Sequence, residues 1–159
     1  MGLRELNRKR NIYLRRLKAK AGKCLFDFKN KNRFTPSKLK TFKKVLFLRN
    51  DDKIGDMIVS TMAFRELKKQ LPKAEICVLA GPASAKVIEN NRSVSRIFIC
   101  RNKFPDILKT GLKLRKEHFD LYIDMDRENT FLTHLLMFLI KPRFAFGFNK
   151  DNFKAYNIT

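Results

Sequence analysis

The sequence has few of the residues that mark several common protein classes. Its 159 residues include no tryptophan and only three cysteines, Cys24, Cys77 and Cys100, which are far apart and form no CxxC pair. This spacing suggests neither a disulfide framework nor a zinc site. Six glycines and five prolines exclude collagen-like and low-complexity chains, and 44% hydrophobic residues exclude wholesale disorder. One globular domain, alone or with an arm, remains.

Long hydrophobic runs are also missing. The longest, residues 131–140, is interrupted by Thr133 and His134, and it is much shorter than the roughly 20 residues that cross a bilayer. The basic start of the chain runs into lysines where a secretory signal needs an apolar stretch. We therefore expect a cytoplasmic protein, which can still lie on the surface of a membrane.

Acidic residues are scarce, with 15 Asp and Glu against 36 Lys and Arg and a net charge of +21. Residues 1–44 hold 16 of the bases and two of the acids, which gives this quarter of the chain a net charge of +14. Such asymmetry indicates an anionic partner, either a nucleic acid or a membrane surface.

The N-terminal segment has the pattern of a basic amphipathic helix. Apolar residues recur mostly at three- and four-residue steps between Arg and Lys, which predicts about five helical turns ending at Gly22. The apolar positions are Leu3, Leu6, Tyr13, Leu14, Leu17 and Ala21. Residues 24–40 are interpreted as a linker with a short packed segment. We expect a helical arm with its linker over residues 1–42 and a domain over residues 43–159.

From residue 44 onward, apolar runs alternate with helical stretches, which is typical of consecutive βα units. The helix over 56–70 is expected to turn Ile58, Met62, Leu67 and Phe64 inward. Strands are predicted at 45–48, 76–79, 96–100, 121–123 and 144–146, and helices at 56–70, 83–89, 107–117 and 129–140. The predicted fold class is α/β, a Rossmann-like parallel sheet.

Ligands of open parallel sheets bind at the carboxyl ends of the strands, which draws attention to residues 49–56. This loop has a single glycine, so it matches neither a dinucleotide fingerprint nor a P-loop. Asp56 is expected in the first turn of a helix, where the dipole favours a carboxylate, and Gly55 lets another molecule come close. A role of Asp56 as a mere helix cap is equally compatible with this spacing.

Several segments resemble glycosyltransferase family 9, the ADP-heptose:lipopolysaccharide heptosyltransferases. The first is residues 44–61, followed by 65–68 and 71–72, which resembles the opening of the family. Further similar segments are residues 76–82, 87–91, 119–124 and 142–148, in the expected order over about residues 43–149. Within the family, the chain looks most like the enzymes that add heptose to Kdo in the inner core.

The resemblance implies the N-terminal, acceptor-binding half of a GT-B fold, with Asp56 as the general base of an inverting, metal-independent transfer. A sugar hydroxyl must lose its proton as it attacks the anomeric carbon, and a fixed carboxylate can accept it. The implied donor is ADP-heptose, without a cofactor or a metal, although Asp124 and Asp126 are similar to the metal-binding DxD of another glycosyltransferase class. Acceptor contacts are expected from Arg49, Lys53, Gly55, Arg101, Lys103 and Arg127; for the basic residues among these, a solvated loop is about as compatible with the sequence.

The same resemblance implies that the acceptor is Kdo-lipid A, which is anchored in the bacterial inner membrane. We therefore expect the basic arm, residues 1–40, to lie on the anionic inner face of that membrane. The family's donor-binding half does not fit in 159 residues, so we expect a truncated, incomplete enzyme. The alternative is a basic nucleic-acid-binding α/β module, but no RNP, zinc or helix-turn-helix signature supports it, so no nucleic acid is expected. A phosphoacceptor domain of the receiver type would explain Asp51 and Asp52, yet it needs an Asp where Cys100 and Arg101 stand.

Overall fold

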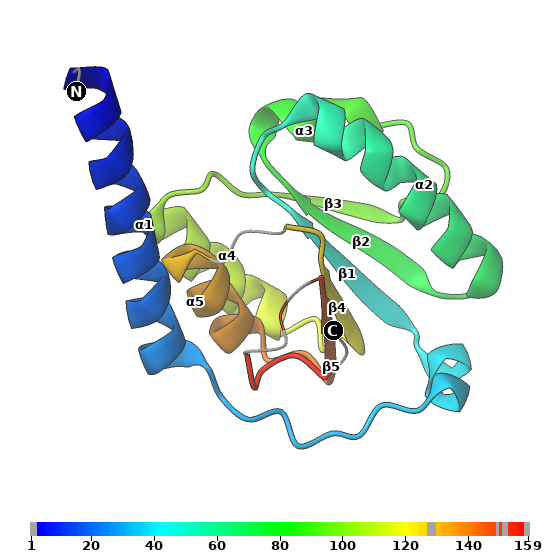
Figure 1. The fold of residues 1–159 in the computed structure, drawn as a ribbon. Helices are drawn as coiled ribbons and strands as arrows, with labels where there is room; N and C mark the ends of the chain where they lie inside the picture. Colours follow the sequence, from blue (N-terminus) through cyan, green and yellow to red (C-terminus); the bar gives the residue numbers. More distant parts are fainter. Residues whose placement is uncertain (1–2, 127–129, 149, 151–152, 158–159) are drawn as a thin grey trace.

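The computed structural model describes residues 3–126, 130–148, 150 and 153–157 and has an α/β fold (Figure 1). Five parallel strands form one sheet in the order β3-β2-β1-β4-β5. The strands are β1 (Lys44–Arg49), β2 (Glu75–Ala80), β3 (Arg96–Ile99), β4 (Leu121–Asp124) and β5 (Phe144–Gly147). The helices are α1 (Leu3–Phe26), a 3-10 helix (Pro36–Thr41), α2 (Ile54–Gln70), α3 (Pro82–Ile88), α4 (Phe104–Arg115) and α5 (Phe131–Ile140). The predicted Rossmann-like α/β class is confirmed.

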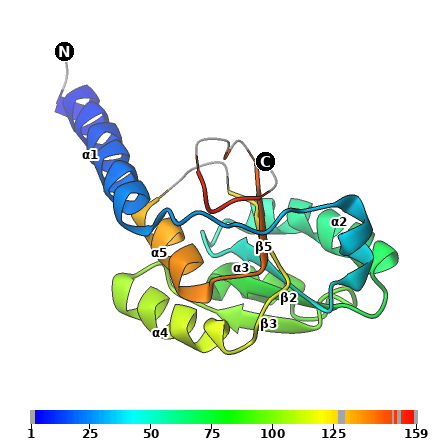
Figure 2. The ribbon, with the colours of Figure 1, turned by 90° about the horizontal axis from the view of Figure 1, so that it is seen from below.

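Both faces of the sheet are buried, which explains why its strands are nearly continuous apolar runs. Successive side chains of a strand point to opposite faces, so Val45 and Phe47 of β1 pack in one core while Leu46 and Leu48 pack in the other. Helices α2 and α3 cover the first face, and α4 and α5 cover the second (Figures 1 and 2). The sheet therefore separates two cores and leaves the carboxyl ends of its strands open at one edge.

Helix α1 is longer than the sequence predicts, because Gly22 does not end it. The helix continues to Phe26 and crosses α5 at Gly22, where an added Cβ would come within 2.9 Å of the Cα of Phe131. Gly22 thus serves close helix packing, and the prediction of a helix stop was wrong. The N-terminal part of α1 projects from the domain (Figure 2). Among the described residues, no helix combines the length and the apolar character that a membrane span requires.

The segment after α1 is tied to the domain rather than being a free linker. Asp27 Oδ1 accepts a hydrogen bond from the amide of Ala155 at 3.0 Å, and the amide of Asn30 donates to the carbonyl of Lys154 at 3.1 Å. Asn32 Nδ2 donates to the carbonyl of Arg143 at 2.8 Å. Together with the α1–α5 crossing, these contacts fix the direction in which α1 leaves the domain.

The buried face of α2 differs from the predicted one. Met57, Ser60 and Phe64 are buried, whereas Ile58 and Met62 are more than half exposed. The buried residues and the exposed apolar residues both recur at helical spacing, so the sequence alone did not decide which face of α2 packs on the sheet. Phe64 decides the rotation of the helix, because its ring packs against Phe47 with the centroids 4.7 Å apart. The expectation that Ile58 and Met62 point inward was wrong, whereas the expectation for Phe64 is confirmed.

Candidate active site

A cleft of about 1210 Å³ opens at the carboxyl ends of the strands. Four parts of the chain line it: the loop after β1, the loop after β3, the loop after β4 with the first turn of α5, and one face of α1. The charged and amide side chains among its lining residues are Arg15, Lys18, Arg49, Asn50, Asp51, Lys53, Asp56, Asn102 and Asp126. The sheet topology and the position of α1 together gather residues that are more than 100 positions apart in the sequence.

Asp56 lies in this cleft, in the first turn of α2. Its carboxylate pairs with Arg49 Nη2 at 3.0 Å and with Lys53 Nζ at 3.7 Å, and 46% of the side chain remains exposed. The N-cap position belongs to Lys53, and the contacts of the Asp56 carboxylate are these ion pairs. Beside Asp56, a Cβ added to Gly55 would meet no atom of the described residues within 4 Å, apart from its chain neighbours and the backbone of its own helix. A partly exposed carboxylate held by two cations can accept a proton from a bound hydroxyl.

Arg49 connects three carboxylates of the cleft. It is the last residue of the buried strand β1 and is itself 8% exposed. Its guanidinium contacts Asp126 through Nη1 and Asp56 through Nη2, and Asp51 lies 3.9 Å from Nη1. The planar guanidinium suits such multiple pairing better than an ammonium group. Arg49 thus fixes the positions of Asp56 and Asp126 relative to each other.

The environment of Asp126 is unusual for a carboxyl group. Burial, together with the negative charges of Asp124 and Asp51, raises the pKa of Asp126 to about 6. Arg49 opposes this effect and lowers the pKa of Asp126. A group that titrates near neutral pH can exchange protons with a ligand, so Asp126 is a second acid–base candidate beside Asp56.

We predict that the side-chain carboxyl carbon of Asp126 titrates with a midpoint near pH 6 in a 13C NMR titration of the folded protein. Since the folded-state pKa lies above the ordinary value, the ionised carboxyl of Asp126 lowers the free energy of unfolding at neutral pH. This destabilisation is relieved as the pH falls through 6 and the carboxyl is protonated. In Arg49→Met the midpoint rises, because the guanidinium that favours the ionised form is gone. A midpoint near pH 4 in the wild-type protein would contradict this assignment.

Asp124 has a structural environment that differs from that of Asp126. It is fully buried at the end of β4, accepts a hydrogen bond from Tyr156 Oη at 2.5 Å and pairs with Lys150 Nζ at 3.3 Å. Its other oxygen accepts from the amide of Asp126 at 2.9 Å. The two carboxylates of the DxD-like pair thus have separate partners. Within the described ranges, no group of three or more His, Cys, Asp or Glu could hold a metal ion.

Asp52 points away from the cleft and stabilises a neighbouring helix. Its carboxylate accepts hydrogen bonds from the amides of Ala83 and Ser84, at 2.7 and 3.0 Å, at the start of α3. Asp52 has a φ of 61°, and an added Cβ on Gly81 would come within 2.3 Å of its Oδ1. Only a glycine at position 81 allows this approach. The acidic pair Asp51–Asp52 therefore contributes only Asp51 to the cleft lining.

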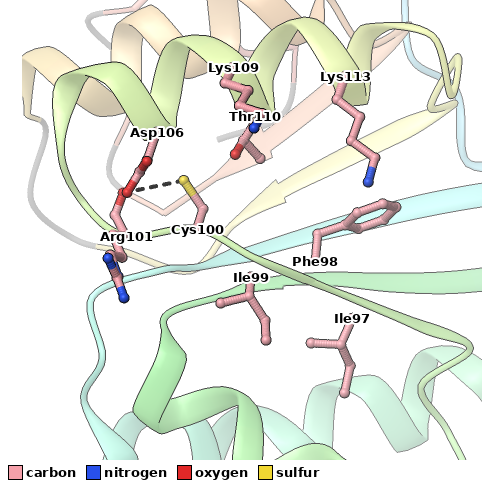
Figure 3. Close-up of a pocket in the computed structure, with 9 residues that line it drawn as sticks. All are labelled: Ile97, Phe98, Ile99, Cys100, Arg101, Asp106, Lys109, Thr110 and Lys113. Atoms are coloured by element: carbon pink, nitrogen blue, oxygen red, sulfur yellow. Dashed lines mark hydrogen bonds between the residues drawn. The ribbon is translucent and has the colours of Figure 1, made fainter.

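The predicted acceptor contacts are only partly gathered around Asp56. Arg49 and Lys53 line the cleft, whereas Arg101 lines a separate pocket of about 560 Å³ with Lys109 and Lys113 (Figure 3). Lys103 lies at the N-cap of α4 and lines neither cavity. Arg127 lies outside the described residues.

The rule on strand ends selects Asn50 and Asp126, and both residues line the cleft. Sequence reasoning missed Arg15 and Lys18 as lining residues. Arg15 and Lys18 gave no such signal, because only the packing of α1 on α5 brings them to the cleft.

Comparisons with known proteins bear on this site. No family model matches the chain. The chain is 26% identical over 152 residues to the curated Escherichia coli K12 protein named "Putative lipopolysaccharide heptosyltransferase 4". The match covers 94% of this chain and 41% of the relative, so the chain spans about two fifths of the length of that protein.

Two solved structures share the fold. The glycosyltransferase of family 9 from Veillonella parvula has a TM-score of 0.56 and 18% identity, over 66% of this chain and 31% of its own. The ADP-heptose lipopolysaccharide heptosyltransferase II of E. coli has a TM-score of 0.55 and 21% identity, over 66% of this chain and 30% of its own. Together, the comparisons confirm the resemblance to glycosyltransferase family 9 and the α/β fold.

Proposed function

From the resemblance to glycosyltransferase family 9, we propose that the chain is the acceptor-binding half of a heptosyltransferase of lipopolysaccharide inner-core synthesis. The observation that carries the proposal is the position of Asp56, in a cleft at the carboxyl end of β1, within the segment that resembles the family opening. The proposed reaction transfers heptose from ADP-heptose to a Kdo-lipid A type of acceptor. Residues 43–159 form the acceptor domain in this proposal, and a second domain binds the donor.

In the proposed mechanism, Asp56 accepts the proton of the acceptor hydroxyl while the hydroxyl oxygen forms a bond to the anomeric carbon of heptose and the bond to ADP breaks. This in-line displacement inverts the anomeric centre. Arg49 and Lys53, at 3.0 and 3.7 Å, hold the Asp56 carboxylate in place. Gly55 leaves room for the sugar to approach. The reaction as proposed needs no metal and no cofactor besides the donor.

A transfer assay tests this proposal. The protein and a complete donor-binding domain are incubated with ADP-heptose and Kdo-lipid A in detergent, and the acceptor mass is followed by mass spectrometry. A mass increase of one heptose is expected in the presence of EDTA as well as in its absence. An unchanged acceptor, in the presence of a complete donor domain, would contradict the proposed function.

We also propose that α1 lies on the inner face of the inner membrane, where a Kdo-lipid A acceptor is anchored. Leu6, Tyr13 and Leu17 are 51%, 63% and 44% exposed. At 100° per residue they lie on the side of α1 opposite Gly22, the residue that packs on α5. An apolar stripe of this kind, flanked by Lys and Arg, suits the interface of an anionic bilayer.

We predict that Leu6→Gln/Leu17→Gln lowers binding to vesicles of phosphatidylethanolamine and phosphatidylglycerol about tenfold in co-sedimentation, because two half-buried leucines contribute on the order of 1 kcal/mol each. The matched control is Ile58→Gln/Met62→Gln, which removes exposed apolar side chains from α2. Equal sedimentation of both variants and the wild type would refute the membrane role. Steeply salt-dependent DNA binding without vesicle binding would favour the nucleic-acid alternative.

A further inference from the structure

Helix α1 is held rigidly enough to form one wall of the cleft. At Gly22 it approaches the backbone of α5, and the ring of Phe26 packs against those of Phe131 and Phe138 with centroids 5.4 and 5.5 Å apart. Lys23 Nζ lies over the ring of Phe153, 5.1 Å from its centroid. These contacts hold the last turns of α1 against the domain, so the turns that precede them have a defined direction.

Two basic residues of α1 lie on the same side of the helix as Gly22. Lys18 precedes Gly22 by four residues and Arg15 precedes it by seven, so both fall one and two turns away on the packed face. Both side chains are exposed and line the cleft that contains Asp56. The neighbouring bases Arg16 and Lys20 are exposed as well, but they are not among the lining residues.

The two bases change the charge of the cleft. Among the described residues, its other charged lining side chains are two cations, Arg49 and Lys53, and three carboxylates, Asp51, Asp56 and Asp126. Without α1, the net charge of these five side chains is negative, which repels an anionic sugar. Arg15 and Lys18 reverse the sign of this sum.

We propose that Arg15 and Lys18 form an anion subsite that binds a carboxylate or phosphate of the acceptor and so determines acceptor specificity. This inference rests on the proposed function for the identity of the acceptor. The guanidinium and the ammonium group both form charge-assisted hydrogen bonds with such anions. The subsite places the anionic part of the ligand against α1, while its hydroxyl faces the carboxylates at the opposite side of the cleft.

The experiment compares two variants of α1 that lose the same charge. Arg15→Ala/Lys18→Ala removes the subsite, and Arg16→Ala/Lys20→Ala removes two positive charges that do not line the cleft. All four side chains are exposed, so both variants keep the fold, which the thermal midpoint verifies. The probe is a deacylated, Kdo-bearing glucosamine disaccharide, with and without its phosphates, titrated calorimetrically. Because it lacks acyl chains, membrane binding does not contribute.

Arg15→Ala/Lys18→Ala is expected to raise the Kd for the disaccharide probe at least tenfold. The control, Arg16→Ala/Lys20→Ala, is expected to change this Kd less than about twofold. If Arg15→Ala/Lys18→Ala weakens the binding of both forms of the probe, the subsite binds the Kdo carboxylate. If it weakens the binding of the phosphorylated form alone, the subsite binds phosphate. The inference is overturned if both variants weaken probe binding equally, or if neither variant weakens it. Inorganic phosphate is a second probe: if its binding depends on Arg15 and Lys18 while no Kdo-bearing probe binds, the subsite stands and the proposed function fails.

Discussion

Asp56→Asn is expected to lower kcat for heptose transfer by a factor of about 10²–10⁴, the usual contribution of a general base. The amide has nearly the same shape as the carboxylate but cannot accept the proton of the acceptor hydroxyl. Because the substitution leaves the cleft wall intact, KM for the acceptor should change little. The measurement is a steady-state transfer assay that compares the variant with the wild type, each as the full gene product.

The matched control for this prediction is Asp106→Asn. Asp106 is also a carboxylate in the first turn of a helix that follows a parallel strand, but it lines the separate pocket of Arg101. This variant should transfer at the wild-type rate. Transfer that survives in Asp56→Asn would sink the base assignment and would turn attention to Asp126, the other carboxyl of the cleft with acid–base character.

Lys150→Met is expected to lower the free energy of unfolding by roughly 3 to 5 kcal/mol, because it leaves the buried carboxylate of Asp124 without its cation. Both side chains of this pair are 0% exposed. The change is measured by urea denaturation at pH 7. The substitution also loosens the support of the active-site loop, since Asp124 accepts the amide of Asp126.

Two further variants separate the ion pair from a general effect of losing a lysine. Lys154→Met removes an exposed lysine a few residues away and should cost less than about 0.5 kcal/mol. Asp124→Asn/Lys150→Met should cost less than the sum of its single substitutions, since it removes both charges. If Lys150→Met were no more destabilising than Lys154→Met, the buried pair would not exist in solution.

The sheet could be predicted from the sequence because its strands are buried on both faces. Each is a short apolar run between helical stretches, and β1 shows this most clearly in Val45 to Leu48. The rotation of α2 could not be predicted in the same way. Met57 and Phe64 lie on one face of the helix and Ile58 and Met62 on another, and all four are apolar, so the sequence does not decide which face is buried. A ring contact with Phe47, made across the fold, decides that competition.

The candidate site was predictable where a single strand end defines it. Arg49 ends β1, and Gly55 and Asp56 lie in the first turn of the helix that follows it, so the rule for parallel sheets selects them. The pairing of Arg49 with Asp126 and the position of Arg15 could not be read from the sequence, because each depends on how separate elements pack. Gly22 is the clearest case, since glycine both ends helices and permits close crossings, and the sequence does not distinguish these uses.

The orientation of α1 gives the molecule a spacer of defined thickness. Leu6 and Leu17 lie on one side of the helix, while Arg15 lies nearly opposite them and lines the cleft. A helix with its side chains is about 10 Å across. If the apolar side rests among lipid head groups, as proposed above, the proposed anion subsite stands about one helix diameter above the membrane. In this proposal, the thickness of a single helix determines which sugar of a membrane-anchored acceptor can reach Asp56.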